Sequence, residues 1–214
     1  RVHIVPGVIQ RSRLPNVMRG EETQVLGVLQ TLPAEAGGDL LIGLPGSHSK
    51  WVEVVDGCIT HFDTFMTGEV FAVLSEHSIL GRTQQQGVAF DGVAFDRGVQ
   101  VALSADGELG VLSTLFSART LGLTGELAPT AQADYLSGLM IGHELAALAA
   151  VQRRRRHSVH LPAIILIGNA QLCARYGRAL DACGFARVTL AEQATERGLW
   201  QLALAAGLLD SSSR

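Results

Sequence analysis

A short run of small residues that ends in a lysine is the first candidate for chemistry. Pro45-Gly46-Ser47-His48-Ser49-Lys50 joins two apolar segments that read as strands. Small residues leave several backbone N–H groups free to surround an anion, so this turn could bind phosphate. It is not a Walker loop, because the G-x-x-x-x-G-K-S/T spacing is absent and a strand follows the lysine. The alternative is a turn that only closes a hairpin.

The second candidate lies where a buried-type strand runs into a helix. Residues 164–167 are four apolar residues, and Gly168-Asn169 follows them at a predicted helix start. A ligand can lie on the backbone at such a point and meet the positive end of the helix dipole. The alternative is that Asn169 only caps the helix.

Two adjacent acids are the third candidate. Glu21 and Glu22 stand in the first turn of a predicted helix. Negative charge is favourable there because of the helix dipole, so simple charge matching explains the pair as well as a functional role does.

Other kinds of site have no support in the sequence. Asp134, His143 and Glu144 share or adjoin one predicted helix, but no H-E-x-x-H or comparable spacing occurs, so a site built around a metal alone is not expected. No G-x-S-x-G nucleophile elbow occurs either. The three cysteines form no C-x-x-C pair, which argues against a disulfide framework or a zinc knuckle and fits a reducing cytoplasm.

Composition excludes further classes of protein. With 214 residues, 47% hydrophobic and 17% charged, the chain can bury a core and is not a disordered or collagen-like protein. A formal net charge of -3 provides no basic field for nucleic acid, and no apolar run approaches the length of a membrane span. We therefore expect neither a nucleic-acid nor a membrane partner.

The remaining sequence predicts the elements that position these candidates. Apolar periodicity, together with Gly and Pro breaks, predicts helices at 24–32, 67–80, 131–153, 170–182 and 191–209, and strands near 2–8 and at 40–44, 50–55, 58–65, 163–167 and 186–190. Asp56-Gly57 is a tight hairpin signal between the third and fourth of these strands. The last third alternates strand and helix, which is typical of parallel pairing.

This order predicts an α/β fold. An antiparallel meander at 40–65 precedes the parallel crossover units, and the strand near 2–8 is expected to join the same mixed sheet, with helices on both faces. Three antiparallel strands followed by crossover units are the pattern of an actin-like kinase lobe.

Three motifs, in order along the chain, resemble the 2-dehydro-3-deoxygalactonokinase family. They are Asn-Val-Met-Arg-Gly-Glu-Glu-Thr-Gln at 16–24, Leu-Pro-Gly-Ser-His-Ser-Lys-Trp at 44–51 and Phe-Met-Thr-Gly-Glu at 65–69. The resemblance continues through residues 137–144 and through Gly168-Asn169 followed by Tyr176. It implies a two-lobed sugar kinase of the hexokinase-like and actin-like (ribonuclease H-like) fold, with ATP and Mg²⁺ between the lobes.

The resemblance also implies roles for individual residues. Glu21 would be the base that accepts the proton of the sugar hydroxyl, with Glu22 as the second candidate, while Asn16 and Arg19 would bind the sugar acid. The phosphate hairpin and the adenosine turn would bind the nucleotide through Gly46, Ser47, His48, Ser49, Lys50, Gly168 and Asn169. No protein ligand to the metal is implied.

The implied reaction is transfer of the ATP γ-phosphate to 2-dehydro-3-deoxy-D-galactonate, giving the 6-phosphate, in galactonate catabolism in the cytoplasm. Residues 1–35 would be a crossover segment from a first lobe, and residues 36–214 the second, nucleotide-binding lobe. No Asp-Trp-Gly phosphate loop of the family's first lobe occurs, so we expect little or no activity from this chain alone, and a homodimer as one way to cover its apolar surface. The alternative function is a non-catalytic actin-like lobe for assembly or regulation.

Overall fold

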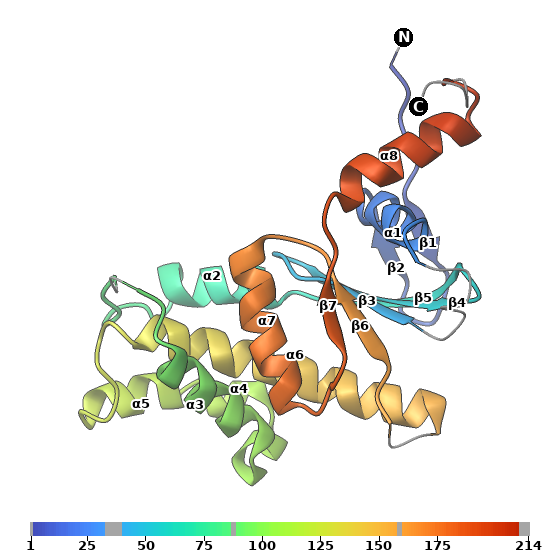
Figure 1. Cartoon of the computed structure of the whole chain (residues 1–214). Helices are drawn as coiled ribbons and strands as arrows, with labels where there is room; N and C mark the ends of the chain where they lie inside the picture. The colour runs from blue at the N-terminus through green and yellow to red at the C-terminus, as the bar shows by residue number, and fades with distance from the viewer. Residues whose placement is uncertain (1, 33–39, 87–88, 158–159, 210–214) are drawn as a thin grey trace.

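The computed structural model describes residues 2–32, 40–86, 89–157 and 160–209. Its centre is a five-stranded mixed sheet in the order β5-β4-β3-β6-β7, and a separate two-stranded sheet pairs β1 with β2. Helices cover both faces of the large sheet (Figure 1). The α/β prediction is therefore confirmed.

The predicted meander forms one half of the large sheet. Its strands are β3 (Leu40–Leu44), β4 (Ser49–Val55) and β5 (Cys58–Phe65), and both pairings are antiparallel. Asp56 and Gly57 connect β4 to β5 with positive φ angles of 49° and 74°. Aspartate and glycine tolerate this left-handed backbone, which explains why the Asp-Gly pair marks the turn.

The other half of the sheet is parallel. β6 (Ala163–Leu166) pairs with β3, and β7 (Val188–Leu190) pairs with β6, with α7 (Ala170–Ala182) as the crossover between them. Three antiparallel strands thus precede two parallel ones, and this is the order that the actin-like lobe was expected to have.

One face of the sheet is covered by α3 (Gly92–Leu103), α6 (Gln132–Arg156) and α7, which surround a core that includes Trp51, Phe95 and Tyr176. Glycines let α3 and α6 approach closely: a Cβ on Gly138 would lie 1.9 Å from the carbonyl oxygen of Phe95. Shorter helices extend this layer: α2 (Thr67–His77), the 3₁₀ helix η1 (Ala105–Leu109), α4 (Val111–Thr114) and α5 (Ser117–Leu123).

The opposite face carries elements from both ends of the chain. These are β1 (Val8–Gln10), β2 (Asn16–Met18), α1 (Glu21–Leu29) and the start of α8 (Ala194–Ala205), which form a second core with the sheet. α8 lies against α1 (Figure 1). A Cβ on Gly27 would lie 2.0 Å from the carbonyl oxygen of Ala194, so only glycine allows this helix contact.

One predicted strand is wrong. Residues 2–7 form no strand, and Val8–Gln10 pairs antiparallel with β2 outside the large sheet. Pro6 has no N–H to donate to a strand ladder, which explains why the extended pattern does not continue into the sheet. Helix bounds also shift, since α1 begins at Glu21 and α8 spans only Ala194–Ala205.

In the part of the chain that the structure describes, no helix combines the length and apolar character needed to cross a membrane.

Candidate active site

The turn between β3 and β4 is fixed from one side by the start of α2. A Cβ on Gly68 would lie 2.4 Å from the carbonyl oxygen of Gly46, so the two backbones are in direct contact. The backbone N–H of Glu69 donates to the carbonyl oxygen of Ser47 at 3.0 Å. The side chains of His48 and Glu69 also contact one another. The contacts with α2 therefore hold the turn in one conformation.

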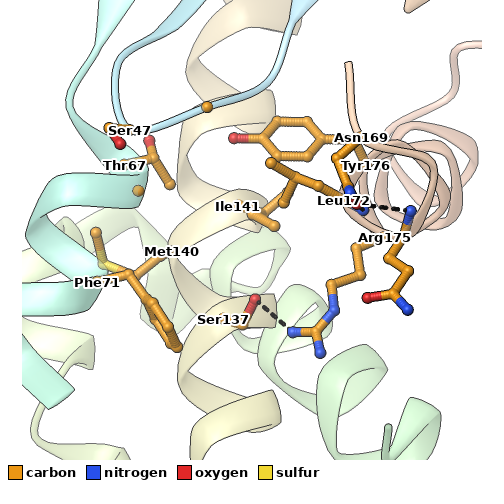
Figure 2. Close-up of a pocket in the computed structure, with 13 residues that line it drawn as sticks. Ser47, Thr67, Phe71, Ser137, Met140, Ile141, Asn169, Leu172, Arg175 and Tyr176 are labelled. Atoms are coloured by element: carbon orange, nitrogen blue, oxygen red, sulfur yellow. Dashed lines mark hydrogen bonds between the residues drawn. The ribbon is translucent and has the colours of Figure 1, made fainter. Parts of the chain in front are cut away.

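A cavity of about 360 Å³ opens beside this turn, between α2, α6 and α7 (Figure 2). It is lined by Gly46, Ser47, Thr67, Gly68, Phe71, Ser137, Met140, Ile141, Asn169, Gln171, Leu172, Arg175 and Tyr176. Gly46 and Ser47 of the predicted phosphate hairpin thus share one cavity with Asn169 of the predicted adenosine turn. Gly168 does not line the cavity, but a Cβ at that position would lie 3.5 Å from the carbonyl oxygen of Pro45, so the two turns adjoin.

Asn169 caps α7, as the second of the two interpretations of this residue predicts. Its Oδ1 accepts hydrogen bonds from the backbone N–H groups of Gln171, at 2.9 Å, and Leu172, at 3.2 Å. The cap fixes where α7 begins and therefore which α7 residues face the cavity.

Arg175 is a cavity residue that the sequence reasoning missed. Its Nη2 lies 2.9 Å from Oδ1 of Asp134, its Nη1 donates to Oγ of Ser137 at 3.3 Å, and its guanidinium lies 4.5 Å from the centre of the Phe90 ring. These three contacts fix a cation at the cavity wall. The available signal was helical spacing, because residues 171, 172 and 175 lie on one face of a helix that Asn169 starts.

A buried polar cluster lies beneath the turn and was also missed. Oε1 of Glu144 accepts from the Trp51 indole at 2.7 Å, and Oε2 accepts from the Tyr176 hydroxyl at 2.9 Å. The Tyr176 hydroxyl also lies 2.8 Å from Oγ of Ser49. Burial raises the pKa of Glu144, although hydrogen bonds from Thr67, Trp51, Tyr176 and Ser49 oppose that rise. Burial also raises the pKa of Tyr176, and the Glu144 charge adds to it.

A second hollow, of about 570 Å³, contains the candidate base. It is lined by Gly7, Val8, Ile9, Val17, Met18, Arg19, Glu21, His48 and Lys50. Oε2 of Glu21 accepts from the backbone N–H of Arg19 at 2.9 Å, which orients the carboxylate. The amine of Lys50 is itself held, since it donates to the Val17 carbonyl and to Oγ1 of Thr64, both at 2.8 Å.

Three other predicted site residues lie outside both hollows. Oε2 of Glu22 accepts from the backbone N–H of Gly20 at 2.7 Å, which caps the start of α1. Nδ2 of Asn16 donates to the Phe62 carbonyl at 3.4 Å. Ser49 is fully buried, so its hydroxyl contacts Tyr176 and not solvent. Their predicted roles are untested, and any effect of Ser49 on a ligand must pass through the turn that it supports.

Within the described ranges, no group of three or more His, Cys, Asp or Glu residues is arranged to hold a metal ion. Two carboxylates lie beside the turn outside the buried cluster, Glu21 in the second hollow and Glu69 against His48.

The sequence profile of the family described as 2-keto-3-deoxy-galactonokinase matches residues 1–202. The chain belongs to this family. The resemblance of the three sequence motifs is therefore confirmed.

Individual relatives agree with this result. A protein from Rhizobium meliloti (strain 1021) that carries the name 2-dehydro-3-deoxygalactonokinase is 38% identical over 203 residues, which cover 92% of this chain and 62% of the relative.

A 2-dehydro-3-deoxygalactonokinase of Escherichia coli (strain K12) is 35% identical over 185 residues, covering 86% of this chain and 58% of that protein. A crystal structure of a Sinorhizobium meliloti protein, described by the same enzyme name, superposes with a TM-score of 0.82 at 35% identity and covers 95% of this chain and 65% of that one. The chain thus spans less than two thirds of the length of these 2-keto-3-deoxy-galactonokinase relatives.

Proposed function

We propose that the protein carrying this chain is an ATP-dependent kinase that phosphorylates the 6-hydroxyl of 2-dehydro-3-deoxy-D-galactonate. The observation that carries the proposal is the position of the β3–β4 turn between two hollows. Gly46 and Ser47 line the first hollow, while His48 and Lys50 line the second together with Glu21. A phosphate bound at this turn would be accessible to a ligand in either hollow, and phosphate transfer between two substrates requires this arrangement. The names of the relatives support this choice of sugar acid.

The first hollow suits a nucleotide. Its volume is in the range of small-molecule sites, and its wall combines apolar side chains such as Phe71 and Leu172 with polar groups. Backbone N–H groups of the turn and the guanidinium of Arg175 are the groups that would bind phosphate oxygens. The Gly168-Asn169 turn would support the adenosine.

The second hollow suits an acidic acceptor. Arg19 and Lys50 bring positive charge to its wall, which complements the carboxylate of a sugar acid. Glu21 lies in the same hollow, where its carboxylate would accept the proton of the attacking hydroxyl. A bond then forms between that oxygen and the γ-phosphorus, and the bond from phosphorus to the ADP oxygen breaks.

Mg²⁺ is expected to accompany ATP. This ion commonly binds phosphate oxygens, water and only one or two carboxylates, so a site without a cluster of three acidic ligands is compatible with it. Glu21 and Glu69, beside the turn, are the carboxylates of this chain that would contact its water shell. When bound, Mg²⁺ supplies charge neutralisation to the phosphates.

We also propose that residues 1–35 cross from a first lobe and that residues 36–214 form the nucleotide-binding lobe, in a cytoplasmic enzyme. α1 and α8 share a core with the sheet, so the two proposed parts are packed against one another. The alternative is a non-catalytic assembly or regulatory lobe, which would bind a nucleotide without phosphorylating a sugar acid.

The test is phosphorylation by the complete natural protein. Formation of ADP from Mg·ATP is measured with 2-dehydro-3-deoxygalactonate and, for comparison, with galactonate, which lacks the 2-keto group. Turnover with the former supports the proposal. A purified protein that binds Mg·ATP but phosphorylates no sugar acid would instead favour the non-catalytic lobe.

Glu21→Gln is the decisive variant. We expect kcat to fall by about a hundredfold or more, because a general base is lost, while Mg·ATP binding changes little. Glu22→Gln is the matched control, since its carboxylate lies outside the second hollow and caps α1. An equal loss from Glu22→Gln alone would move the assignment to Glu22, and nearly unchanged turnover in both variants would remove this segment from the chemistry.

A further inference from the structure

The acid that is most completely buried beneath the β3–β4 turn has no part in the mechanism above. Glu144 is 3% exposed and does not line either hollow. Burying a carboxylate is costly unless hydrogen bonds compensate it, so its retention here needs a reason. Its partners supply one, because they lie on β4, on α7 and at the start of α2, and the turn before β4, α7 and α2 each contribute residues to the nucleotide hollow.

The partners of Glu144 surround the turn. Trp51 lies on β4, immediately after the turn, and donates its indole N–H to Oε1. Tyr176 lies on α7 and joins Oε2 of Glu144 to Oγ of Ser49, which is the first residue of β4. Hydrogen bonding to Thr67 extends the cluster to the start of α2, whose backbone contacts Gly46 and Ser47.

The cluster therefore connects the two halves of the predicted nucleotide site. Ser49 belongs to the phosphate hairpin, and Tyr176 belongs to the helix that Asn169 caps. The rings of Trp51 and Tyr176 also lie together, with centroids 6.2 Å apart. A single carboxylate with two acceptor oxygens can fix both elements, because each oxygen receives a donor from a different one.

We propose that Glu144 is a positioning residue for nucleotide binding, acting through Tyr176 and Trp51 to hold the β3–β4 turn at a fixed distance from α7. The inference rests on the proposed function, since it concerns the same hollow. Loss of this carboxylate leaves the turn and α7 free to separate, and a nucleotide that must contact both then binds more weakly. None of the cluster residues is among those that line the acceptor hollow on the other side of the turn.

Glu144→Leu and Tyr176→Phe test the proposal in the complete natural protein. We expect Glu144→Leu to raise the KM for Mg·ATP about tenfold, as for the loss of a hydrogen bond to a charged group, with the KM for the sugar acid unchanged. Glu144→Gln keeps the shape and one acceptor oxygen, and should return the KM for Mg·ATP to within about threefold of wild type. Calorimetry with Mg·ADP gives the same comparison without turnover.

Two further measurements separate positioning from general destabilisation. Gln152→Leu removes another fully buried, hydrogen-bonded polar side chain of α6, whose amide donates to Glu53 at 2.7 Å, and should lower Tm without changing either KM. The double variant Glu144→Gln with Tyr176→Phe should bind Mg·ADP no more weakly than Tyr176→Phe alone, because Glu144→Gln weakens only the link to Tyr176, which Tyr176→Phe has already removed.

Each outcome decides a point. Additive losses in the double variant would overturn the proposal, since Tyr176 would then act on the nucleotide by itself. So would a folded Glu144→Leu protein with unchanged Mg·ADP affinity, or an equal rise in both KM values. If Glu144→Leu does not fold, the Gln and Phe variants decide alone. A wild-type protein that binds no Mg·ADP would overturn the proposed function along with this inference.

Discussion

Asp63 lies on β5, an edge strand of the five-stranded sheet, and its negative charge contributes to the stability of that edge. Its two oxygens accept from the guanidinium of Arg155, at 2.7 and 3.3 Å, and Arg155 also donates to Glu53 at 2.6 Å. Burial raises the pKa of Asp63, but the hydrogen bonds and charges of Arg155 and His61 outweigh that effect and leave the pKa below its ordinary value. The folded protein therefore stabilises the charged form of the Asp63 carboxylate relative to the protonated form.

A pH dependence follows from this direction. Because the folded pKa is lowered, the stabilisation is present above the unfolded pKa and is lost as the pH falls through the folded pKa. We expect Asp63→Asn to lower the free energy of unfolding by about 1 kcal/mol at neutral pH and by less at acid pH. Urea unfolding of both proteins at several pH values checks this prediction.

The matched control for Asp63 is Asp96→Asn. Asp96 pairs with Arg178, but both side chains are exposed, so the pair should contribute little to stability. A cost for Asp63→Asn that does not decline with acid, or an equal cost for Asp96→Asn, would contradict the prediction.

At the scale of elements, the contact between α2 and the β3–β4 turn can be tested through Gly68. Gly68→Ala would place a Cβ 2.4 Å from the Gly46 carbonyl oxygen and 2.8 Å from the Ser47 Cα. Neither neighbour is a flexible side chain, so α2 or the turn must shift. We expect a loss of about 1–3 kcal/mol of stability together with weaker Mg·ADP binding in the complete protein, measured by denaturation and calorimetry.

Gly177→Ala is the control, because it lies within α7 and a Cβ there meets nothing within 4 Å. Alanine is a better helix former than glycine, so this variant should be more stable by about 0.5–1 kcal/mol. Tighter or unchanged nucleotide binding in Gly68→Ala would show that the turn does not depend on α2.

Elements with local signals could be predicted from the sequence. The meander follows from alternating apolar residues and from Asp56-Gly57, and α7 follows from its asparagine cap. The β1–β2 ribbon could not be predicted, because its three residue pairs depend on the sheet beneath it and not on local propensity. The parallel strand expected near 2–8 was wrong for a different reason, because Pro6 has no N–H to donate to a strand ladder.

The residues of the candidate site also differ in whether a local sequence signal marks them. Gly46, Ser47 and Asn169 could be found because turn and cap residues have distinctive local chemistry. Arg175 had only helical spacing as a signal and Glu144 had none, since an arginine or glutamate within a helix is ordinarily a solvated side chain. Only the packing of α6 against α7 and β4 brings Glu144 to Tyr176 and Trp51.

At the scale of the whole molecule, the exposed apolar residues near the start of the chain predict self-association. Val2, Ile4 and Leu14 are 90%, 87% and 80% exposed, and association is favourable when it removes such apolar side chains from water. We expect the 214-residue chain by itself to form dimers or aggregates, as measured by sedimentation or by light scattering after size exclusion. It should also bind Mg·ATP weakly or not at all, because the 214-residue chain would contact the nucleotide from one side only and leave its phosphates exposed to water. Micromolar binding by a monodisperse monomer would contradict both expectations.

The contact between α1 and α8 also determines when this protein can finish folding. The side chains of Gln24 and Thr195, 171 positions apart, are joined by a 2.9 Å hydrogen bond where the two helices meet. At ribosomal rates of about 5–20 residues per second, α1 waits roughly ten to thirty seconds for its partner to be synthesised. During that interval the face of α1 at Gly27 lacks its partner helix, so we expect chaperones that bind nascent chains to have access to it.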